Sequence, residues 1–454
     1  MKKTIILLLV TLMLITVTVS AADTLNLTVQ QAVTLTLQNN PQLQQVLAKR
    51  DQVSAQVGQA EASNWPTVTL SDSFDPWGYQ SATYYGLKAG TGYPSGNYTI
   101  SGDSGITNGL NVAVQYPLFT GGAITYGIKQ AKAALDGLDQ QVQLTRQQLK
   151  YNASSAYYTA VNWKNQVVVA QSNVDTQNEH LRVVNAQYNA GVVAKSDVLQ
   201  TQSDLAKAMT QLITAQNSYA IAILALKTTM NISLGTDIVL AEDLNIKQDS
   251  LDKAALVDYA LKNRPDYLAS KIAIQGDEYA LKVSEAGYYP TIALGATYSN
   301  SLTNDASSPF KSTNYDYNTY NSNSNQVAVS ANLQYNVFDG FLVKNQVKAA
   351  TAQIAQDQQA SELSRLQVIL QVNQAIDQIG TDLKLIAANK AYLDYATENY
   401  KINVVQYASG VTTNLNVMTA QSDLANAQSQ YWNSLYSFNK DTASLALATG
   451  VPVQ

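Results

Sequence analysis

The chain consists of two copies of one unit, and this internal duplication restricts its fold more than any other feature of the sequence. Residues 39–70 match residues 263–294 at a constant offset of 224, which places Pro41 on Pro265. From Tyr116 onward the offset becomes 219 and then holds without a gap. Two unrelated helices rich in alanine and glutamine would not keep one register through proline, glycine and aromatic landmarks. We therefore expect two structurally equivalent halves.

The N-terminus has the features of a secretory signal peptide. Lys2 and Lys3 are followed by an apolar run from Ile5 to Val19 and by small residues before Asp23. A retained membrane anchor is the weaker alternative, because the apolar run is short for a spanning helix. The expected division of the chain is a signal peptide at 1–22, a first repeat at 23–245 and a second repeat at 246–454.

Four segments have the character of β-strands, two in each repeat. We expect upward strands at 67–74 and 291–300, and returning strands at 110–119 and 327–338. In the returning strands apolar and polar side chains alternate, as in a barrel strand with one face toward lipid and the other toward a lumen. A half-buried strand of a soluble sheet gives the same alternation, so the pattern alone fits both.

The placement of aromatic residues favours the membrane interpretation. Each strand is expected to have an aromatic residue at its helix-proximal end, where an interfacial aromatic girdle would lie. These residues are Trp65, Phe119, Tyr289 and Phe338.

The number of strands has a consequence for assembly. The segments that join each strand pair, residues 75–108 and 301–325, are rich in Gly, Ser, Asn and Tyr and have no apolar period, so we expect exposed surface loops. Four strands are too few to close a barrel around a lumen, and hydrocarbon does not tolerate open sheet edges. If these strands lie in a membrane, the chain must therefore oligomerise.

After each returning strand the pattern becomes helical. The first such helix has no proline as far as Asn189, so it is expected to run for about 60 residues, or about 90 Å. The return helices, 197–231 and 416–449, are about half as long. Helices at 41–63 and 265–287 have lengths suited to stack end to end with them.

The first long helix carries a heptad seam. Its positions are Ile124, Ile128, Ala131, Leu135, Leu138, Val142, Thr145, Leu149, Asn152 and Ala156. Between the halves, residues 232–250 and a short helix at 251–263 are expected to form a side decoration.

Composition gives little support to catalysis or nucleic-acid binding. Charged residues make up 13% of the chain, the formal net charge is -5, and there is no basic patch. The chain has no cysteine, and its one histidine, His180, is expected to be a solvated or interhelical residue rather than a base. We therefore expect no enzyme activity, no cofactor, no metal site and no nucleic-acid partner.

These landmarks resemble the TolC-type outer-membrane efflux proteins across essentially the whole mature chain. The resemblance rests on the duplicated helix, the strand starts at Trp65-Pro66 and Tyr289-Pro290, the strand-to-helix turn Tyr116-Pro117-Leu118-Phe119-Thr120-Gly121-Gly122, and the motif Tyr188-Asn189-Ala190-Gly191 followed by Asp197-Val198-Leu199. It implies an α+β membrane protein, in which a homotrimer forms a transmembrane β-barrel from four strands per protomer. A long α-helical barrel of coiled-coil hairpins would continue this β-barrel.

The resemblance also implies a function. The chain would be a passive duct that crosses the outer-membrane lipid and the periplasm in a tripartite efflux pump or type I secretion system. Its partners would be a periplasmic adaptor (membrane fusion) protein and an inner-membrane pump or ABC exporter.

The same resemblance implies a gate at the periplasmic tips of the helical hairpins. Tyr407 matches the family's gating tyrosine and Asp197 its partner aspartate, although an acid in the first turn of a helix needs no gating role. Thr412 stands at the family's arginine, and Asn416 and Thr419 at its two pore-facing aspartates, so the salt-bridged lock lacks these charges. The implied adaptor-docking tip consists of Tyr188, Gly191, Val192, Gly410 and Val411.

Two other functions fit part of the pattern. A trimeric coiled-coil stalk or adhesin would use the helices as spacers without transport, but it should have uninterrupted heptads and one set of membrane strands. A general diffusion porin would lack the long helices.

Overall fold

The computed structural model describes residues 25–75, 79–87, 96–103, 106–241, 244–246, 252–304 and 321–450. The expected signal peptide lies outside these residues. The chain forms two compact units, and each contains parts of both repeats. The helical unit comprises the chain up to Arg50, Leu138–Ser270 and the chain from Ala360, and the strand-bearing unit comprises Asp51–Gly137 and Lys271–Gln359.

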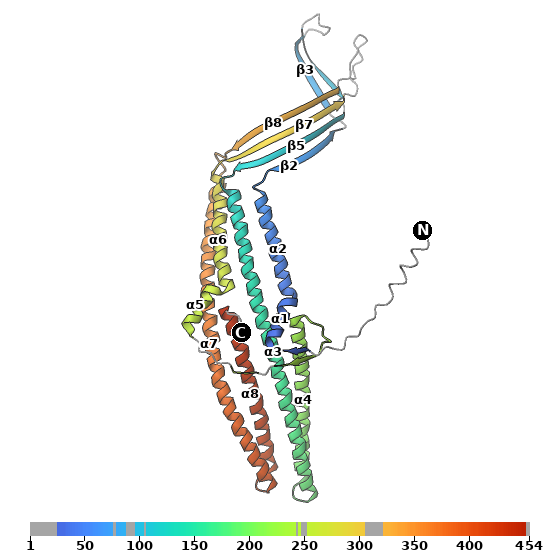
Figure 1. The fold of residues 1–454 in the computed structure, drawn as a ribbon, viewed down its shortest axis with the longest axis vertical. Helices are drawn as coiled ribbons and strands as arrows, with labels where there is room; N and C mark the ends of the chain where they lie inside the picture. The colour runs from blue at the N-terminus through green and yellow to red at the C-terminus, as the bar shows by residue number, and fades with distance from the viewer. Residues whose placement is uncertain are drawn as a thin grey trace, which may run out of the picture. The chain divides into compact units, whose positions relative to one another are not determined.

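Both halves have the same order of elements (Figure 1). Each has a helix of 22 or 21 residues, two strands of one sheet, a helix of 67 residues and a helix of 36 residues. In the first half these are α2 (Pro41–Ala62), β2 (Thr67–Asp75), β5 (Ile106–Phe119), α3 (Ala123–Asn189) and α4 (Lys195–Met230). In the second half they are α6 (Pro265–Glu285), β7 (Thr291–Asn304), β8 (Asn321–Gln334), α7 (Leu342–Ala408) and α8 (Asn414–Thr449).

Shorter elements precede each half. A capping box of Thr28 and Gln31 starts α1 (Val29–Asn39), and the side chain of Asp252 caps α5 (Lys253–Asn263). The cap explains why α5 starts two residues later than we expect from the sequence. Strands β1 (Leu25–Leu27) and β6 (Ile238–Leu240) pair in parallel, and a 3-10 turn, η1 (Ala286–Tyr288), follows α6.

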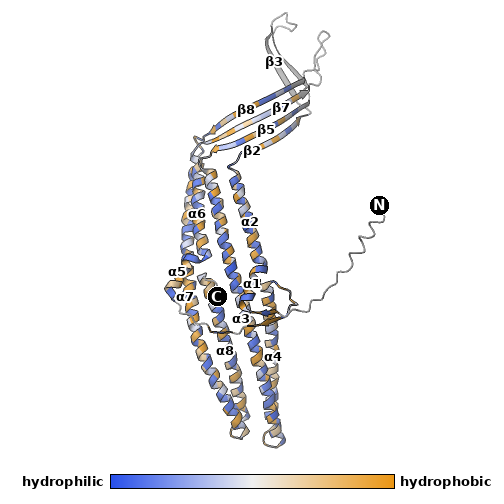
Figure 2. Cartoon of the chain, in the orientation of Figure 1, coloured by the Kyte–Doolittle hydropathy of each residue, from blue (hydrophilic) through white to orange (hydrophobic). Residues whose placement is uncertain are grey.

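The strand-bearing unit contains a four-stranded antiparallel sheet in the order β2-β5-β7-β8. Its register aligns the apolar positions of all four strands on one face. Along the strands, hydrophobic and hydrophilic residues alternate, as the colours in Figure 2 show. One row across the apolar face is Leu70, Val112, Tyr298 and Val327. The next row, on the polar face, is Ser71, Asn111, Ser299 and Gln326.

The last strand ends earlier than the alternation predicts. β8 ends at Gln334, whereas the sequence pattern extends to Phe338. Gln334 pairs with Thr291, the first residue of β7, and β8 has no second neighbour in the sheet. Alternation beyond Gln334 therefore meets no partner strand, and a strand without a partner does not form.

The expectation of a plain loop at 75–108 is wrong in part. Strands β3 (Tyr79–Leu87) and β4 (Gly96–Asp103) form an antiparallel hairpin within it. Their sequences are rich in Tyr, Ser and Thr, which suit strands but show no apolar alternation from which a strand could be predicted. In the second half β7 and β8 also extend into the expected loop, and residues 305–320 lie outside the described part.

The helical unit has its main core where the long helices pass β1 and β6. Tyr157 of α3, Leu226 of α4, Val372 of α7 and Phe438 of α8 belong to this core. The Tyr157 hydroxyl donates to the carbonyl of Leu27 at 3.1 Å, which fastens β1 to α3. All ten seam positions of α3 are buried or half-buried, as the heptad spacing predicts.

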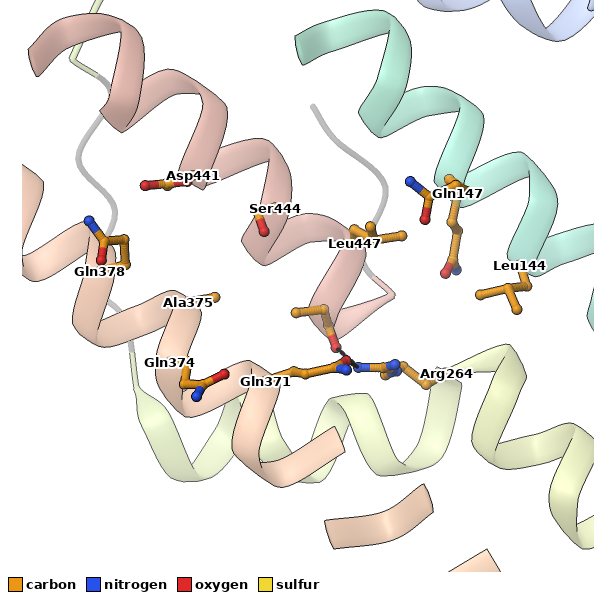
Figure 3. A pocket seen from close by; sticks show the side chains of 12 residues that line it. Leu144, Gln147, Arg264, Gln371, Gln374, Ala375, Gln378, Asp441, Ser444 and Leu447 are labelled. Carbon is orange, nitrogen blue, oxygen red and sulfur yellow. Dashed lines mark hydrogen bonds between the residues drawn. The ribbon is translucent and has the colours of Figure 1, made fainter. Parts of the chain in front are cut away.

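In each half, equivalent contacts join the start of the short helix (α2 or α6) to the end of the 36-residue helix (α4 or α8). We call these two places the helix breaks. In the first half Asn40 Nδ2 donates to the carbonyl of Thr229 at 3.2 Å. In the second half Arg264 takes the place of Asn40, and its Nη1 donates to the carbonyl of Ala448 at 3.2 Å and to Gln371 Oε1 at 2.7 Å. Arg264 and Gln371 are among the residues that line a cavity of about 560 Å³. Figure 3 shows their side chains.

We expect Arg264→Ala to lower the free energy of unfolding by about 2–4 kcal/mol, because it leaves the carboxylate of Asp266 without its buried guanidinium partner. Asn40→Ala removes one neutral hydrogen bond and should cost about 1 kcal/mol. Denaturant unfolding of both variants in detergent measures the difference. Equal losses would contradict a special role for the arginine.

Two carboxyl groups lie together in the second long hairpin. Asp382 of α7 is 1% exposed and lies beside Asp441 of α8. Burial raises the pKa of Asp382 to about 6, with a further contribution from Asp441, while the hydrogen bond from Gln378 acts in the opposite direction. The hairpin therefore binds a proton more tightly than the unfolded chain does.

Because this pKa is raised in the folded state, stability falls as the pH rises from the ordinary value of 3.8 to about 6. Asp382→Asn should raise the Tm at neutral pH and remove most of this dependence. Thermal unfolding in acidic and neutral buffer checks it, with the exposed Glu398→Gln on the same helix as control. A lower Tm of Asp382→Asn at neutral pH would show that the carboxyl group stabilises the hairpin.

Candidate gating and docking site at the helix tips

Both long hairpins turn through the same glycine motif. Gly191 after α3 and Gly410 after α7 have φ angles of +75° and +69°, a region that side chains with a Cβ rarely adopt. The next amides, of Val192 and Val411, donate to carbonyls five residues back at 2.9 and 2.8 Å. This Schellman ending satisfies carbonyls that a helix C-terminus leaves free. It gives both turns a defined backbone.

The expected docking residues lie at these turns. Val192 is 71% exposed and Val411 is 73% exposed. Tyr188 is also exposed, and the Lys195 ammonium lies 5.3 Å from its ring centroid. Each turn thus holds an apolar side chain in solvent.

Asp197 lies in the first turn of α4. The helix follows Ala194, which makes no side-chain cap, and Asp197 is the acid of its first turn. A carboxylate there is favourable because the helix N-terminus carries partial positive charge. The carbonyl of Asp197 accepts from the Thr201 hydroxyl at 2.8 Å and from Asn414 Nδ2 at 3.5 Å. Its backbone therefore contacts the second hairpin.

Tyr407 is buried between the two hairpins. It is 6% exposed and packs with Val184, Val198 and Val417. Burial raises the pKa of the Tyr407 hydroxyl, and the charge of Asp197 raises it further. The hydroxyl has no hydrogen-bond partner among the described residues, so no hydrogen bond joins Tyr407 to Asp197, the partner aspartate that the resemblance implies.

The residues at the family's charged positions make local hydrogen bonds. Asn416 Nδ2 donates to the Thr412 hydroxyl at 2.9 Å, and the Thr413 hydroxyl caps α8 by accepting from the Asn416 amide. Thr419 donates to the carbonyl of Leu415 at 2.9 Å. Asn416 and Thr419 are exposed. The structure therefore brings Thr412 and Asn416 together without an ion pair.

One contact at the tips was not predicted from the sequence. The ring of His180 is buried between helices, with Nε2 2.6 Å from Asn414 Oδ1. A signal was present, because His180, Val184, Gln187 and Gly191 continue a spacing of four, three and four residues. That spacing places His180 on the buried seam of α3.

The expected aromatic girdle lies in the strand-bearing unit. Trp65 precedes β2, Phe119 ends β5 and Tyr289 precedes β7, and all three are exposed. Phe338 lies four residues after β8 and contacts the ring of Phe341 edge-on, with centroids 5.7 Å apart.

The described part of the chain holds no group of three His, Cys, Asp or Glu side chains arranged to bind a metal ion. Within the same residues, no helix has the length and apolar character needed to cross a membrane.

Comparison with known proteins shows the same architecture in one family. The family model described as "Outer membrane efflux protein" matches residues 32–231 and 256–451. Protein CyaE of Bordetella pertussis is 24% identical over 94% of this chain and 84% of its own length, and outer membrane protein TolC of Escherichia coli is 22% identical over 91% and 80%. The crystal structure of VceC from Vibrio cholerae superposes with a TM-score of 0.72 at 17% identity, covering 93% of this chain and 96% of that one.

The family model covers most of the chain in both repeats, and it describes channels rather than enzymes. The chain therefore belongs to the outer membrane efflux protein family, as a channel of the outer membrane that spans into the periplasm and serves efflux or secretion.

Proposed function

We propose that three copies of the chain close a twelve-stranded β-barrel in the outer membrane, with four strands from each protomer. The observation that carries this proposal is the sheet β2-β5-β7-β8, which has two unpaired edges and one exposed apolar face. An unpaired backbone group in hydrocarbon costs several kcal/mol, so both edges must find strands. Pairing β8 of one protomer with β2 of the next leaves no edge.

The channel function favours three protomers over two. The diameter of a barrel grows with its strand number, and eight strands leave an interior that side chains just fill. Twelve strands leave a lumen. In this arrangement the apolar rows face lipid and the Ser, Asn, Thr and Gln rows line the lumen. Trp65, Phe119, Tyr289 and Phe338 then form the girdle at one membrane interface.

Exposed apolar side chains on the long helices support assembly from several copies. Large apolar residues recur on the solvent-exposed faces of α4 and α7, which no described residue of a single chain covers. They include Leu199, Ile213 and Ile221 on α4, and Leu363, Leu370 and Leu385 on α7. Helices of neighbouring protomers would cover these faces and complete a helical barrel.

Opening at the tips by partner proteins is the second part of the proposal. A periplasmic adaptor would bind the turns at Val192 and Val411, and an inner-membrane pump or ABC exporter would supply cargo and energy. The support is geometric, since two rigid turns each present an exposed valine. The buried hydroxyl of Tyr407 lies near Asp197 and has no acceptor among the residues that the structure describes.

The trimer can be tested with disulfides, because the chain has no native cysteine. Thr69→Cys in β2 is combined in turn with Gln326→Cys, Ala328→Cys or Ser330→Cys in β8. Three strand spacings of about 4.8 Å separate these strands within a protomer, too far for a disulfide. We expect one pairing to give a covalent trimer on a denaturing gel.

The matched control joins strands within one protomer. Ala113 and Thr297 lie directly opposite in β5 and β7, so the double cysteine variant should form an intramolecular disulfide and run as a monomer. Monomers from every β2–β8 combination, beside an efficiently oxidised control, would refute the barrel.

Tip docking predicts cross-links to an envelope partner. Val192→Cys and Val411→Cys, treated with a thiol cross-linker in cells, should capture an adaptor or pump component, whereas Gln346→Cys, exposed near the start of α7, should not. Mass spectrometry identifies the captured protein. Intact trimers that yield no partner from either valine would contradict opening by a tip-bound adaptor.

A further inference from the structure

His180 connects all four helices that meet at the tips. Its Nε2 lies 2.6 Å from Asn414 Oδ1, which joins α3 to α8. The Asn414 amide donates to the Thr201 hydroxyl at 3.3 Å, which adds α4. The fourth helix, α7, contributes Tyr407, whose ring centroid lies 5.3 Å from that of His180. One side chain thus lies where the two hairpins of a protomer join.

The direction of these hydrogen bonds shows which ring nitrogen must carry a hydrogen. Thr201 donates its hydroxyl hydrogen to the carbonyl of Asp197 at 2.8 Å, so its oxygen accepts from Asn414. Asn414 uses its amide nitrogen in this way and presents Oδ1 to His180. Nε2 must therefore carry a hydrogen. A neutral ring with an unprotonated Nδ1 meets this requirement.

The burial of the ring opposes a positive charge. His180 is 7% exposed. Burial lowers the pKa of His180, and the hydrogen bond to Asn414 offsets part of that shift. A protonated ring would carry its charge into an apolar cluster that includes Val184 and Tyr407.

The titratable groups around the ring do not provide a bonded counter-ion. On α3, Glu179 is paired with Arg182 at 2.6 Å, and Asp175 lies one turn further back. From α7 come the phenols of Tyr400 and Tyr407, whose pKa values burial raises. Asp197 lies on α4 near Tyr407, and α8 has no charged residue before Asp423. The hydrogen-bond partner of the ring among the described residues is neutral Asn414.

The junction is present in only one repeat. The position 219 residues after His180 is Asn399, which is exposed and accepts a hydrogen bond from Asn403 at 3.0 Å. The position equivalent to Asn414 is Lys195. Each protomer therefore carries one such contact, and the fold of the hairpin does not require it.

We propose that His180 is an acid-sensitive joint, which holds the four tip helices together while it is neutral and loosens them when it is protonated. The inference rests on the proposed opening at these tips and names a group that regulates it. A base whose pKa is lowered by packing supports the packed state above its ordinary value of 6.5. That support is lost progressively as the pH falls below this value.

The single histidine permits a direct test by NMR. The trimer is labelled with ¹⁵N-histidine, purified through a tag without histidine, and titrated in detergent. We expect the Nε2–H tautomer at neutral pH and a pKa of His180 below 6.5. A pKa at or above that value would overturn the joint.

Hydrogen–deuterium exchange tests whether protonation loosens the helices. After correction for intrinsic rates, peptides around Thr201 and Asn414 should lose protection in mild acid in the wild type. His180→Gln keeps an N–H donor but cannot titrate, so the acid-induced loss should disappear. Asn414→Asp places a carboxylate beside the ring and should reverse the response. Equal acid responses in the wild type and His180→Gln would refute the proposal.

Single-channel recording separates this joint from the proposed opening. The joint and the proposed opening at the tips together predict a higher open probability in mild acid for the wild type, and none of this increase for His180→Gln. If acid exposes the tip peptides while the channel is unaffected, the joint stands and opening at the tips is wrong.

Discussion

The proposed assembly depends first on the unpaired backbone groups at the two edges of the four-stranded sheet. Strands β2 and β8 each have a row of unpaired N–H and C=O groups, and in the proposed barrel the membrane would supply no water to satisfy them. The apolar rows of the same sheet and several leucines of α7 are likewise exposed in the single chain. In the proposed trimer one act of assembly would satisfy the strand edges, the lipid-facing rows and the helix faces together.

The duplication gives both halves the same order of helices and strands. The two halves differ in the polar contacts that their side chains make. Asn40 and Arg264 occupy equivalent positions at the helix breaks, but only the arginine forms a charged network. Tyr188 is exposed at one tip, whereas its counterpart Tyr407 is buried between the hairpins. At the tips the two turns keep the same backbone despite this difference, because each is closed by its own hydrogen bonds.

The tip region is held by neutral groups where the family resemblance implied charges. Thr412 and Asn416 bond to each other, and His180, Asn414 and Thr201 form a directed chain of hydrogen bonds. Neutral contacts of this kind contribute about 1 kcal/mol each, less than a buried ion pair costs to break. In the proposed joint, one proton on His180 is therefore sufficient to weaken the packing of the tip helices.

The two repeats, the long helices and the strand faces could be predicted from the sequence, because offsets, heptads and alternation are local and periodic properties. The family resemblance implied a tip at Tyr188, Gly191, Val192, Gly410 and Val411, and the structure shows that both glycines have the positive φ of a Schellman ending. Two features depend on tertiary contacts instead: β8 ends at Gln334, where its partner strand begins, and His180 contacts Asn414. Gln334 and its partner Thr291 are more than 40 positions apart, and His180 and Asn414 are more than 230 positions apart. No local sequence pattern encodes such pairings.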